Sequence, residues 1–213
     1  MSPVILPATL VASYLLGSLP FSYWVALRRG IDVRRVGSGN VGATNVLRSA
    51  GRWAGALALA LDAFKGSAAV MLGEWIASRS PSTPQLEWLV GACGVLAVLG
   101  HLFPVWLGFR GGKGVATAVG AFAPLAPLAL AIGVGVFLAV VLVTRYVSLG
   151  SIVAAAVVAL AAPLTGASRE TAIAVIVVVA LVIARHHANI RRLLAGTESR
   201  LGRARAEAHG GQP

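Results

Sequence analysis

The sequence has few charged residues and very few acidic ones. Only 12% of its 213 residues are charged, against about 25% in an average soluble domain, and Asp and Glu together number 7. The apolar residues make up 57% of the chain and stand in long blocks, and the mean hydropathy is +0.83. This composition excludes an ordinary soluble domain. It predicts an all-α polytopic membrane protein with one compact membrane domain.

The sequence also lacks the residues that several kinds of site need. Its one cysteine, Cys93, lies in an apolar block, so there is no disulfide framework. No group of His, Cys, Asp and Glu has metal-ligand spacing, and we expect neither a metal nor a cofactor. The net charge of +11 could suggest nucleic acid. However, the basic residues stand in short loops between apolar blocks, where positive-inside bias places them, so nucleic acid is not an expected partner.

The apolar blocks predict about seven transmembrane helices. The first block is interrupted by Gly17 and Pro20, and because no basic region precedes it, it is a spanning helix rather than a cleaved signal. The run from 115 to 143 is too long for one helix, and Pro124 and Pro127 divide it into a short helix and a longer one. The expected helices are 4–27, 53–77, 86–107, 115–123, 125–143, 151–164 and 170–186.

The positive charges orient these helices. Four polar segments fall on one side of the bilayer and carry 15 Lys and Arg residues, whereas the other side has only Arg79 and Arg169. The basic side is therefore cytoplasmic, and the N-terminus is periplasmic. We expect residues 1–198 to form the membrane domain and residues 199–213 to be a flexible basic tail. The cytoplasmic segments are 28–52, 108–114, 144–149 and 185–213.

The first cytoplasmic segment contains a polar, glycine-rich stretch from Gly37 to Arg48. Its glycines allow the backbone to bend and expose N–H groups, and its side chains add hydroxyls, amides and a cation. Such a segment suits an anion such as phosphate, although a solvated helix cap is an equally good interpretation of the stretch alone. The candidate residues are Gly37, Ser38, Gly39, Asn40, Thr44, Asn45 and Arg48.

The second cytoplasmic segment is a glycine-rich loop directly before a helix. Glycine N–H groups, a helix N-terminus and two cations together predict a phosphate-binding concavity. The loop lacks the spacing of a Walker A motif, and a flexible basic turn is the alternative. The candidate residues are Gly108, Arg110, Gly111, Gly112, Lys113 and Gly114.

The third group lies near the C-terminus. His186 and Asn189 are three residues apart and share a face if they are helical, although a helix end with basic residues explains the stretch equally well. Glu198 is expected to pair with an arginine in a structural role. Ser148, in the loop before 151, is either a helix cap or a site hydroxyl.

Two charged residues lie within the second apolar block. Asp62 and Lys65 are three apart, and because an unpaired charge is costly in a membrane, we expect them to pair inside the protein. A site for a transported ion is possible at such a pair. A structural ion pair is preferred, because no other acid lies deep in the chain to form a relay.

Three stretches of this sequence together resemble the signature motifs of a known family. Residues 37–48, 100–117 and 186–198 are similar to the three motifs of the bacterial acyl-phosphate:glycerol-3-phosphate acyltransferases, in the same order and between membrane helices. The resemblance covers the chain up to about residue 198. It departs from the family pattern at Arg110, where a lysine is usual, and in the longer basic tail. The His-x4-Asp pattern of the common glycerolipid acyltransferases is absent.

The resemblance implies a reaction and roles for single residues. A fatty acyl group would move from acyl phosphate to the 1-hydroxyl of glycerol 3-phosphate, giving lysophosphatidic acid and phosphate. Ser38 and Arg48 would be essential, Lys113 would belong to the loop that binds glycerol 3-phosphate, and His186 and Asn189 would match the important residues of the third motif. The enzyme would be a monomer in the bacterial inner membrane, functionally linked to an enzyme that makes acyl phosphate.

The sequence leaves two candidates for the catalytic base. The site has almost no carboxylates, so either a phosphate oxygen of a substrate or His186 would take the hydroxyl proton. Ser38 and Asn40 are candidate donors to the oxyanion. The other class of function is a transporter of phosphate esters or other organic anions. It predicts polar residues on both membrane faces, and the periplasmic face has few.

Overall fold

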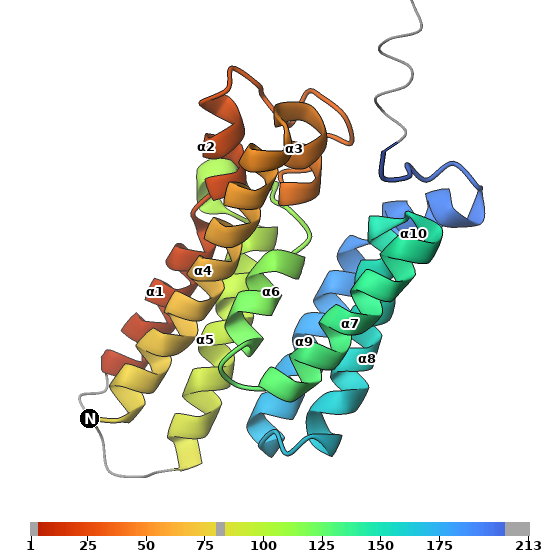
Figure 1. The fold of residues 1–213 in the computed structure, drawn as a ribbon. Coiled ribbons are helices and arrows are strands. Elements are labelled where there is room, and N and C mark those ends of the chain that lie inside the picture. Colours follow the sequence, from red (N-terminus) through yellow and green to blue (C-terminus); the bar gives the residue numbers. More distant parts are fainter. Residues whose placement is uncertain (1–3, 80–83, 203–213) are drawn as a thin grey trace, which may run out of the picture.

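The computed structural model describes residues 4–79 and 84–202, and within them every regular element is a helix (Figure 1). The long helices lie side by side, some parallel and some antiparallel to their neighbours, and three short helices gather at one end of the molecule. The elements are α1 Ile5–Ser18, α2 Phe21–Leu27, α3 Ala43–Ala50, α4 Arg52–Ala77, α5 Pro84–Leu102, the 3-10 turn η1 Val105–Leu107, α6 Val115–Phe122, α7 Pro127–Thr144, α8 Val147–Leu164, α9 Arg169–Arg185 and α10 His187–Leu194.

The helices form two groups that are joined along one seam. Helices α1, α4, α5 and α6 pack on one another, and α7, α8 and α9 form the second group. The seam is made chiefly by α5 against α9, with smaller contacts of α6 with α7 and α9. The short helices α2, α3 and α10 all lie at the same end of the bundle (Figure 1). Polar segments that are far apart in the sequence are thereby brought together at that end.

Small residues let the helices of the first group approach closely. A Cβ atom added at Gly17 of α1 would collide with the carbonyl of Ala97 in α5, and one at Gly120 of α6 would collide with that of Ala63 in α4. Membrane helices use such contacts because lipid tails are as apolar as leucine, so tight packing replaces the hydrophobic effect between helices. The first group is therefore a close-packed support for the polar end.

The number of full-length spans differs from the sequence prediction of seven. Among the described residues five helices are long and apolar enough to cross a bilayer, and the pair α9 and α10, bent by 55°, makes a sixth candidate. Helix α6 has eight residues, well below the ~20 residues that a span needs. Figure 1 shows that α6 descends from the polar end and that α7 runs back toward it. The chain therefore reverses as the prediction of two separate helices required, although α6 is too short to be a full span.

A proline and a residue in the left-handed region mark two breaks between helices. The first apolar block breaks at Leu19 and Pro20, because proline has no N–H to continue the helical hydrogen bonds. The expected loop 144–149 is shorter than predicted: only Arg145, in the left-handed region, and Tyr146 separate α7 from α8. Ser148 thus lies in the first turn of α8, not in a loop. The remaining spans agree with the prediction to within about five residues at each end.

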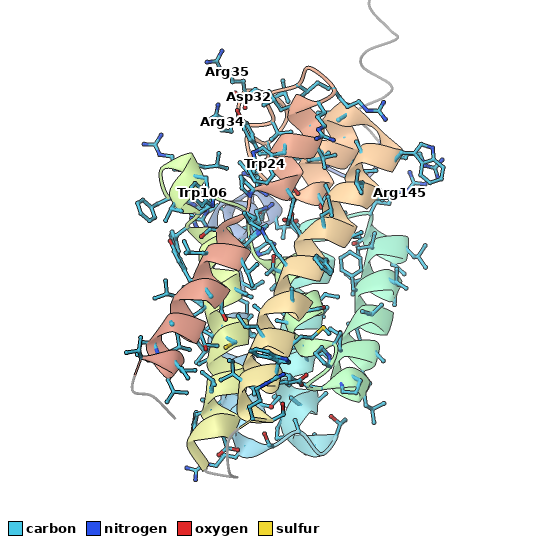
Figure 2. The ribbon with its side chains drawn as sticks, turned by 90° about the vertical axis from the view of Figure 1, so that its left-hand side faces the viewer. Trp24, Asp32, Arg34, Arg35, Trp106 and Arg145 are labelled. Atoms are coloured by element: carbon cyan, nitrogen blue, oxygen red, sulfur yellow. The ribbon has the colours of Figure 1, made fainter. Side chains whose placement is uncertain are left out.

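One end of the molecule carries both cations and tryptophans. In Figure 2 the labelled arginines Arg34, Arg35 and Arg145 lie toward the same end as Trp24 and Trp106, which are both exposed. Tryptophans commonly sit at the level of lipid headgroups, with cations beyond them on the cytoplasmic side. The polar end has the composition of a membrane–water interface.

Candidate active site

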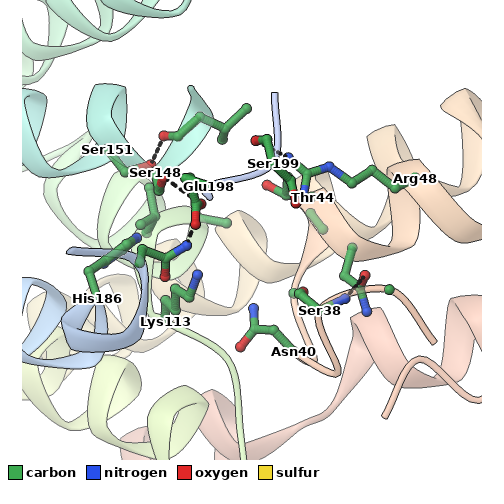
Figure 3. Close-up of a pocket in the computed structure, with 18 of the residues that line it drawn as sticks. Ser38, Asn40, Thr44, Arg48, Lys113, Ser148, Ser151, His186, Glu198 and Ser199 are labelled. Atoms are coloured by element: carbon green, nitrogen blue, oxygen red, sulfur yellow. Dashed lines mark hydrogen bonds between the residues drawn. The ribbon is translucent and has the colours of Figure 1, made fainter. Parts of the chain in front are cut away.

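A cavity of about 1100 Å³ opens at the polar end, between the two groups of helices. Its walls come from the α2–α3 loop, α3, the start of α6, the start of α8, the α9–α10 junction and the segment after α10. Figure 3 shows Ser38, Asn40, Thr44 and Arg48 facing Lys113, His186 and Glu198 across it. Residues of all three motifs therefore meet in one place. The predicted site residues that line it are Gly37, Ser38, Asn40, Thr44, Asn45, Arg48, Lys113, Gly114, Ser148, His186, Asn189 and Glu198.

The loop before α3 is held from below by one buried side chain. Asn45 donates through Nδ2 to the carbonyls of Val33 (2.9 Å) and Val36 (3.1 Å), and its Oδ1 accepts from the Ser38 N–H at 3.2 Å. Gly37 packs so tightly on Asn45 Oδ1 that a side chain would not fit there, and its φ of 59° favours glycine. Asn45 was predicted to bind substrate. Its amide makes hydrogen bonds within the loop that carries Ser38, and direct substrate binding by Asn45 stays a prediction.

Most of the N–H groups that the sequence suggested for phosphate binding in the glycine-rich loop are already bonded within the protein. The N–H of Gly111 donates to the carbonyl of Leu102, and that of Gly112 donates to the carbonyl of His101. Both hydrogen bonds satisfy open carbonyls at the end of α5. The N–H groups of Gly108 and Arg110 are also bonded, to Val105 and Leu107. These four residues therefore have no free N–H to offer a phosphate, whereas phosphate binding by the backbone of Lys113 and Gly114 stays a prediction. The start of α6, directly after Lys113, is the part of this segment that faces the cavity.

Several predicted residues face other spaces. A second cavity, of about 920 Å³, lies beside the first and is lined by Gly39, Gly108, Arg110 and Gly111. The two cavities share five lining residues, so they border the same wall. Gly112 faces a small pocket next to His101, whose ring leaves no room for a side chain at that position. The shared residues are Ser38, Asn40, Lys113, Asn189 and Arg192.

The third motif is organised by one carboxylate. Glu198 Oε1 accepts from Asn189 Nδ2 and from the Ser148 hydroxyl, both at 2.7 Å, and Oε2 accepts from Arg192 Nε at 2.7 Å. The arginine partner predicted for Glu198 is thus Arg192. Burial by itself raises the pKa of Glu198, but these three hydrogen bonds outweigh it and hold that pKa below its usual range. Asn189 and Ser148 were predicted as site groups, and both are tied to this carboxylate.

His186 lies at the bend between α9 and α10 rather than within one helix with Asn189. Its side chain is 2% exposed, and its Nδ1 is 2.7 Å from the carbonyl of Val182. A carbonyl only accepts hydrogen bonds, so this contact places a proton on Nδ1. The neutral ring then keeps its lone pair on Nε2, the form that a proton acceptor requires.

Two cations of the cavity have few partners of their own. Among the described residues, Lys113 Nζ makes no hydrogen bond or ion pair, and Arg48 makes one hydrogen bond, from Nη2 to the carbonyl of Ser199 at 3.3 Å. Burial is the main cause that lowers the pKa of Lys113 to about 8. Glu198 raises this pKa, and three neighbouring arginines lower it further. A cation desolvated without a carboxylate partner is suited to an anionic ligand.

Sequence reasoning missed the segment after Glu198. Ser199 and Arg200 line the cavity, Arg200 Nε donates to the Tyr146 hydroxyl at 3.0 Å, and the Leu201 N–H donates to the carbonyl of Arg145 at 2.8 Å. Residues 199–202 are therefore attached to the bundle and do not begin the flexible tail that was expected. Residues 203–213 of that tail lie outside the described residues. No motif marks these contacts, because one joins two backbone groups and the other joins two side chains.

The predicted ion pair in α4 is confirmed. Lys65 Nζ lies 3.0 Å from Asp62 Oδ1, and both side chains are buried. Lys65 also donates to the carbonyl of Leu19 at 2.8 Å, at the break in the first span, where the same carbonyl accepts from the Phe21 N–H. Asp62 accepts from the Ser22 hydroxyl. The pair thus closes the break between α1 and α2. Asp62 also borders the main cavity from below.

The fold and the cavity define the class of protein first. It is an integral membrane helical bundle with a cavity at its interfacial end that is lined by cations, and the comparisons with known proteins give the family. The glycerol-3-phosphate acyltransferase family matches residues 7–196. The chain is 47% identical over 191 residues to the glycerol-3-phosphate acyltransferase of Trichlorobacter lovleyi, and the aligned region covers 90% of this chain and 95% of that protein. It is 45% identical over 204 residues to that of Sinorhizobium fredii, covering 92% and 94%.

Solved structures agree with this match. The crystal structure of PlsY, an integral membrane glycerol 3-phosphate acyltransferase, in its glycerol 3-phosphate form superposes with a TM-score of 0.86 at 39% identity, over 95% of this chain and 98% of that one. The lysophosphatidic acid form of PlsY gives 0.83, over 92% and 95%. The chain belongs to the glycerol-3-phosphate acyltransferase family and is a membrane-integral acyltransferase of the PlsY type.

Proposed function

We propose that this enzyme transfers a fatty acyl group from acyl phosphate to the 1-hydroxyl of glycerol 3-phosphate. The bond between the acyl carbon and the phosphate oxygen breaks, the acyl carbon bonds to the glycerol oxygen, and the hydroxyl proton leaves. The products are lysophosphatidic acid and inorganic phosphate. One observation carries the proposal beyond the family match: Arg48 and Lys113, two cations with few partners, border one cavity at the interfacial end of an apolar bundle.

The cavity fits the charge of both substrates. Each carries a phosphate group, and two anions repel one another unless cations lie between or beside them. Arg48 and Lys113 supply that charge, and the polar end of the bundle allows phosphates to bind while the acyl chain stays in lipid. Ser38 and Asn40 lie across the cavity from His186 (Figure 3) and are suited to donate hydrogen bonds to the developing oxyanion. Holding the hydroxyl near the acyl carbon supplies the rest of the acceleration.

The proton from the hydroxyl has two candidate acceptors. We propose that a phosphate oxygen of a substrate takes it. Among the residues that the structure describes, Glu198 is the only carboxylate besides Asp62 that borders the cavity, and it already accepts from three donors. His186 is the rival, since its Nε2 is free to accept in the neutral ring. A His186→Gln variant that keeps most of its kcat would exclude the histidine. Loss of one limb of a bell-shaped pH profile in that variant would instead support His186 as the base.

We also propose the cellular placement. In the sequence, 15 of the 18 Lys and Arg residues fall in the four segments predicted on one side, a bias that supports a cytoplasmic polar end and a periplasmic N-terminus. The protein is then a multi-pass, monomeric enzyme of the bacterial inner membrane, with residues 1–198 as its catalytic domain. It receives acyl phosphate from a separate enzyme. Single cysteines placed at Arg79 and at Arg110 in a Cys93→Ser background test this. An impermeant thiol reagent should label only the former from outside intact cells.

The deciding experiment is an acyl-transfer assay on the purified enzyme in lipid. Acyl phosphate, acyl-CoA and no donor are compared in parallel, and lysophosphatidic acid and released phosphate are both measured. We expect product from acyl phosphate only, and loss of it in Ser38→Ala and Lys113→Ala. Product from acyl-CoA alone would overturn the choice of donor. No product from any donor, with folded protein, would favour the transporter, which a flux assay of phosphate esters in liposomes would then test.

A further inference from the structure

Lys113 depends on its backbone for its position. Its Nζ has no hydrogen bond or ion pair with any residue that the structure describes, so no neighbouring side chain fixes its direction. The two residues before it are glycines, which impose no restraint of their own on the chain. Without another restraint, the cation would move with a loose loop. What holds Gly111 and Gly112 therefore decides where Lys113 sits.

The N–H sides of these glycines are fixed to α5. Gly111 donates to Leu102 and Gly112 donates to His101, at 3.1 and 3.2 Å. A Cβ atom at Gly111 would collide with the carbonyl of His101, so the glycines lie flat against the end of the helix. This arrangement leaves both glycine carbonyls pointing away from α5. They need donors from elsewhere in the fold.

One side chain of α9 provides those donors. Arg185 Nη2 donates to the carbonyls of Gly111 (3.1 Å) and Gly112 (3.2 Å), and its Nε donates to Gly112 as well, at 3.3 Å. The guanidinium carbon lies 5.4 Å from the centre of the Phe103 ring, which gives the group a second contact. A planar guanidinium reaches two successive carbonyls at once, whereas an ammonium is a single point charge. Every polar backbone group of the two glycines is thereby bonded.

We propose that Arg185 is the positioning residue for Lys113. It clamps the Gly111–Gly112 dipeptide against α5 and so sets the place from which Lys113 reaches into the cavity. Arg185 directly precedes His186, so the same clamp ties the second motif to the third. The inference rests on the proposed function, because it takes Lys113 to act on a bound anion. Arg185 itself lines the second cavity and not the main one.

A double-mutant cycle tests this assignment. Arg185→Ala, Lys113→Ala and the double variant are compared with the parent enzyme in the acyl-transfer assay, with radiolabelled glycerol 3-phosphate to read low rates. If Arg185 acts through Lys113, its removal lowers kcat/KM at least tenfold in the parent and less than twofold in the Lys113→Ala background. If the two effects multiply, Arg185 acts on its own and the proposal fails. The same cycle is read for binding, from the rise in melting temperature caused by glycerol 3-phosphate.

Two further variants separate positioning from charge and from folding. Arg185→Lys keeps the charge but contacts one carbonyl at a time, so it should fall between the parent and Arg185→Ala, and it replaces Arg185→Ala in the cycle if that variant does not fold. Arg191→Ala removes an exposed cation from the same end and should match the parent. Full activity in Arg185→Ala overturns the inference. A parent enzyme without acyl transfer instead overturns the proposed function.

Discussion

Asn189 and Ser148 donate to the same oxygen of Glu198, each at 2.7 Å. The carboxylate therefore joins the start of α8, the start of α10 and the segment that follows α10. Asn189 is 4% exposed, and its Oδ1 has no hydrogen-bond partner among the described residues. Because Glu198 takes its Nδ2, this free oxygen is the group that Asn189 can present to a ligand donor. The hydrogen bond to Glu198 therefore fixes the orientation of the Asn189 amide.

Replacing Glu198 with glutamine should therefore cost activity as well as stability. The glutamine amide brings a donor where the carboxylate accepted three, so one of Ser148, Asn189 and Arg192 loses its acceptor. A buried polar group left unsatisfied costs about 1–3 kcal/mol, and a loss of that size in the transition state lowers kcat/KM by roughly tenfold or more. Initial rates measure it. Glu170→Gln, at the opposite end of α9, is the control, and parental rates in Glu198→Gln would contradict the prediction.

The rate should depend on pH through Lys113. Burial lowers the pKa of Lys113 to about 8, so the ammonium is charged below that pH and is lost as the pH rises through it. A phosphate monoester gains its second negative charge at about pH 6. We expect kcat/KM for glycerol 3-phosphate to rise through about pH 6 and to fall above about pH 8. The upper limb should vanish in Lys113→Arg, because a guanidinium stays charged. An unchanged upper limb in that variant would assign the fall to another group.

Replacing Asn45 with aspartate should loosen the loop that carries Ser38. Aspartate keeps the size of the side chain but removes both donors to Val33 and Val36, and its charge is repelled by their carbonyls. Each lost buried hydrogen bond costs ~1 kcal/mol or more. We expect faster amide hydrogen exchange over residues 33–42 and a large fall in activity. Arg52→Ala, exposed at the start of α4, controls for general damage. Normal exchange with lost activity would point instead to direct substrate contact by Asn45.

The Asp62–Lys65 pair should matter for stability and not for turnover. Asp62→Asn leaves the Lys65 ammonium buried with the Leu19 carbonyl, and removing one partner of a buried pair costs about 3–5 kcal/mol. The double variant Asp62→Asn, Lys65→Met removes both charges and should regain most of the lost melting temperature in detergent. Its acyl-transfer rate should stay within a few fold of the parent. A stable but inactive double variant would show that the pair takes part in function, as an ion site would.

The sequence by itself determined the class of fold, the helical segments and the family. These properties depend on local features: the length of an apolar block against the thickness of a bilayer, the places of Pro20 and Pro127, and the order of three motifs. It also predicted that the polar segments share one end, because each crossing of the membrane reverses the chain. The run after Lys113 was divided at the right place, but its first helix was counted among the seven spans although the eight-residue α6 is too short to cross a bilayer.

Only the tertiary structure decided which polar groups are free to act. Composition cannot show that the N–H groups of Gly111 and Gly112 are taken by α5, that Asn45 is spent on its own loop, or that Arg185 clamps the glycines. These outcomes depend on how the backbone turns in space, and some depend on partners far away in the chain: Arg185 is 73 residues from Gly112, and Arg48 is 151 from Ser199. Each polar group can make only a few hydrogen bonds, and the tertiary structure determines which partners it bonds to.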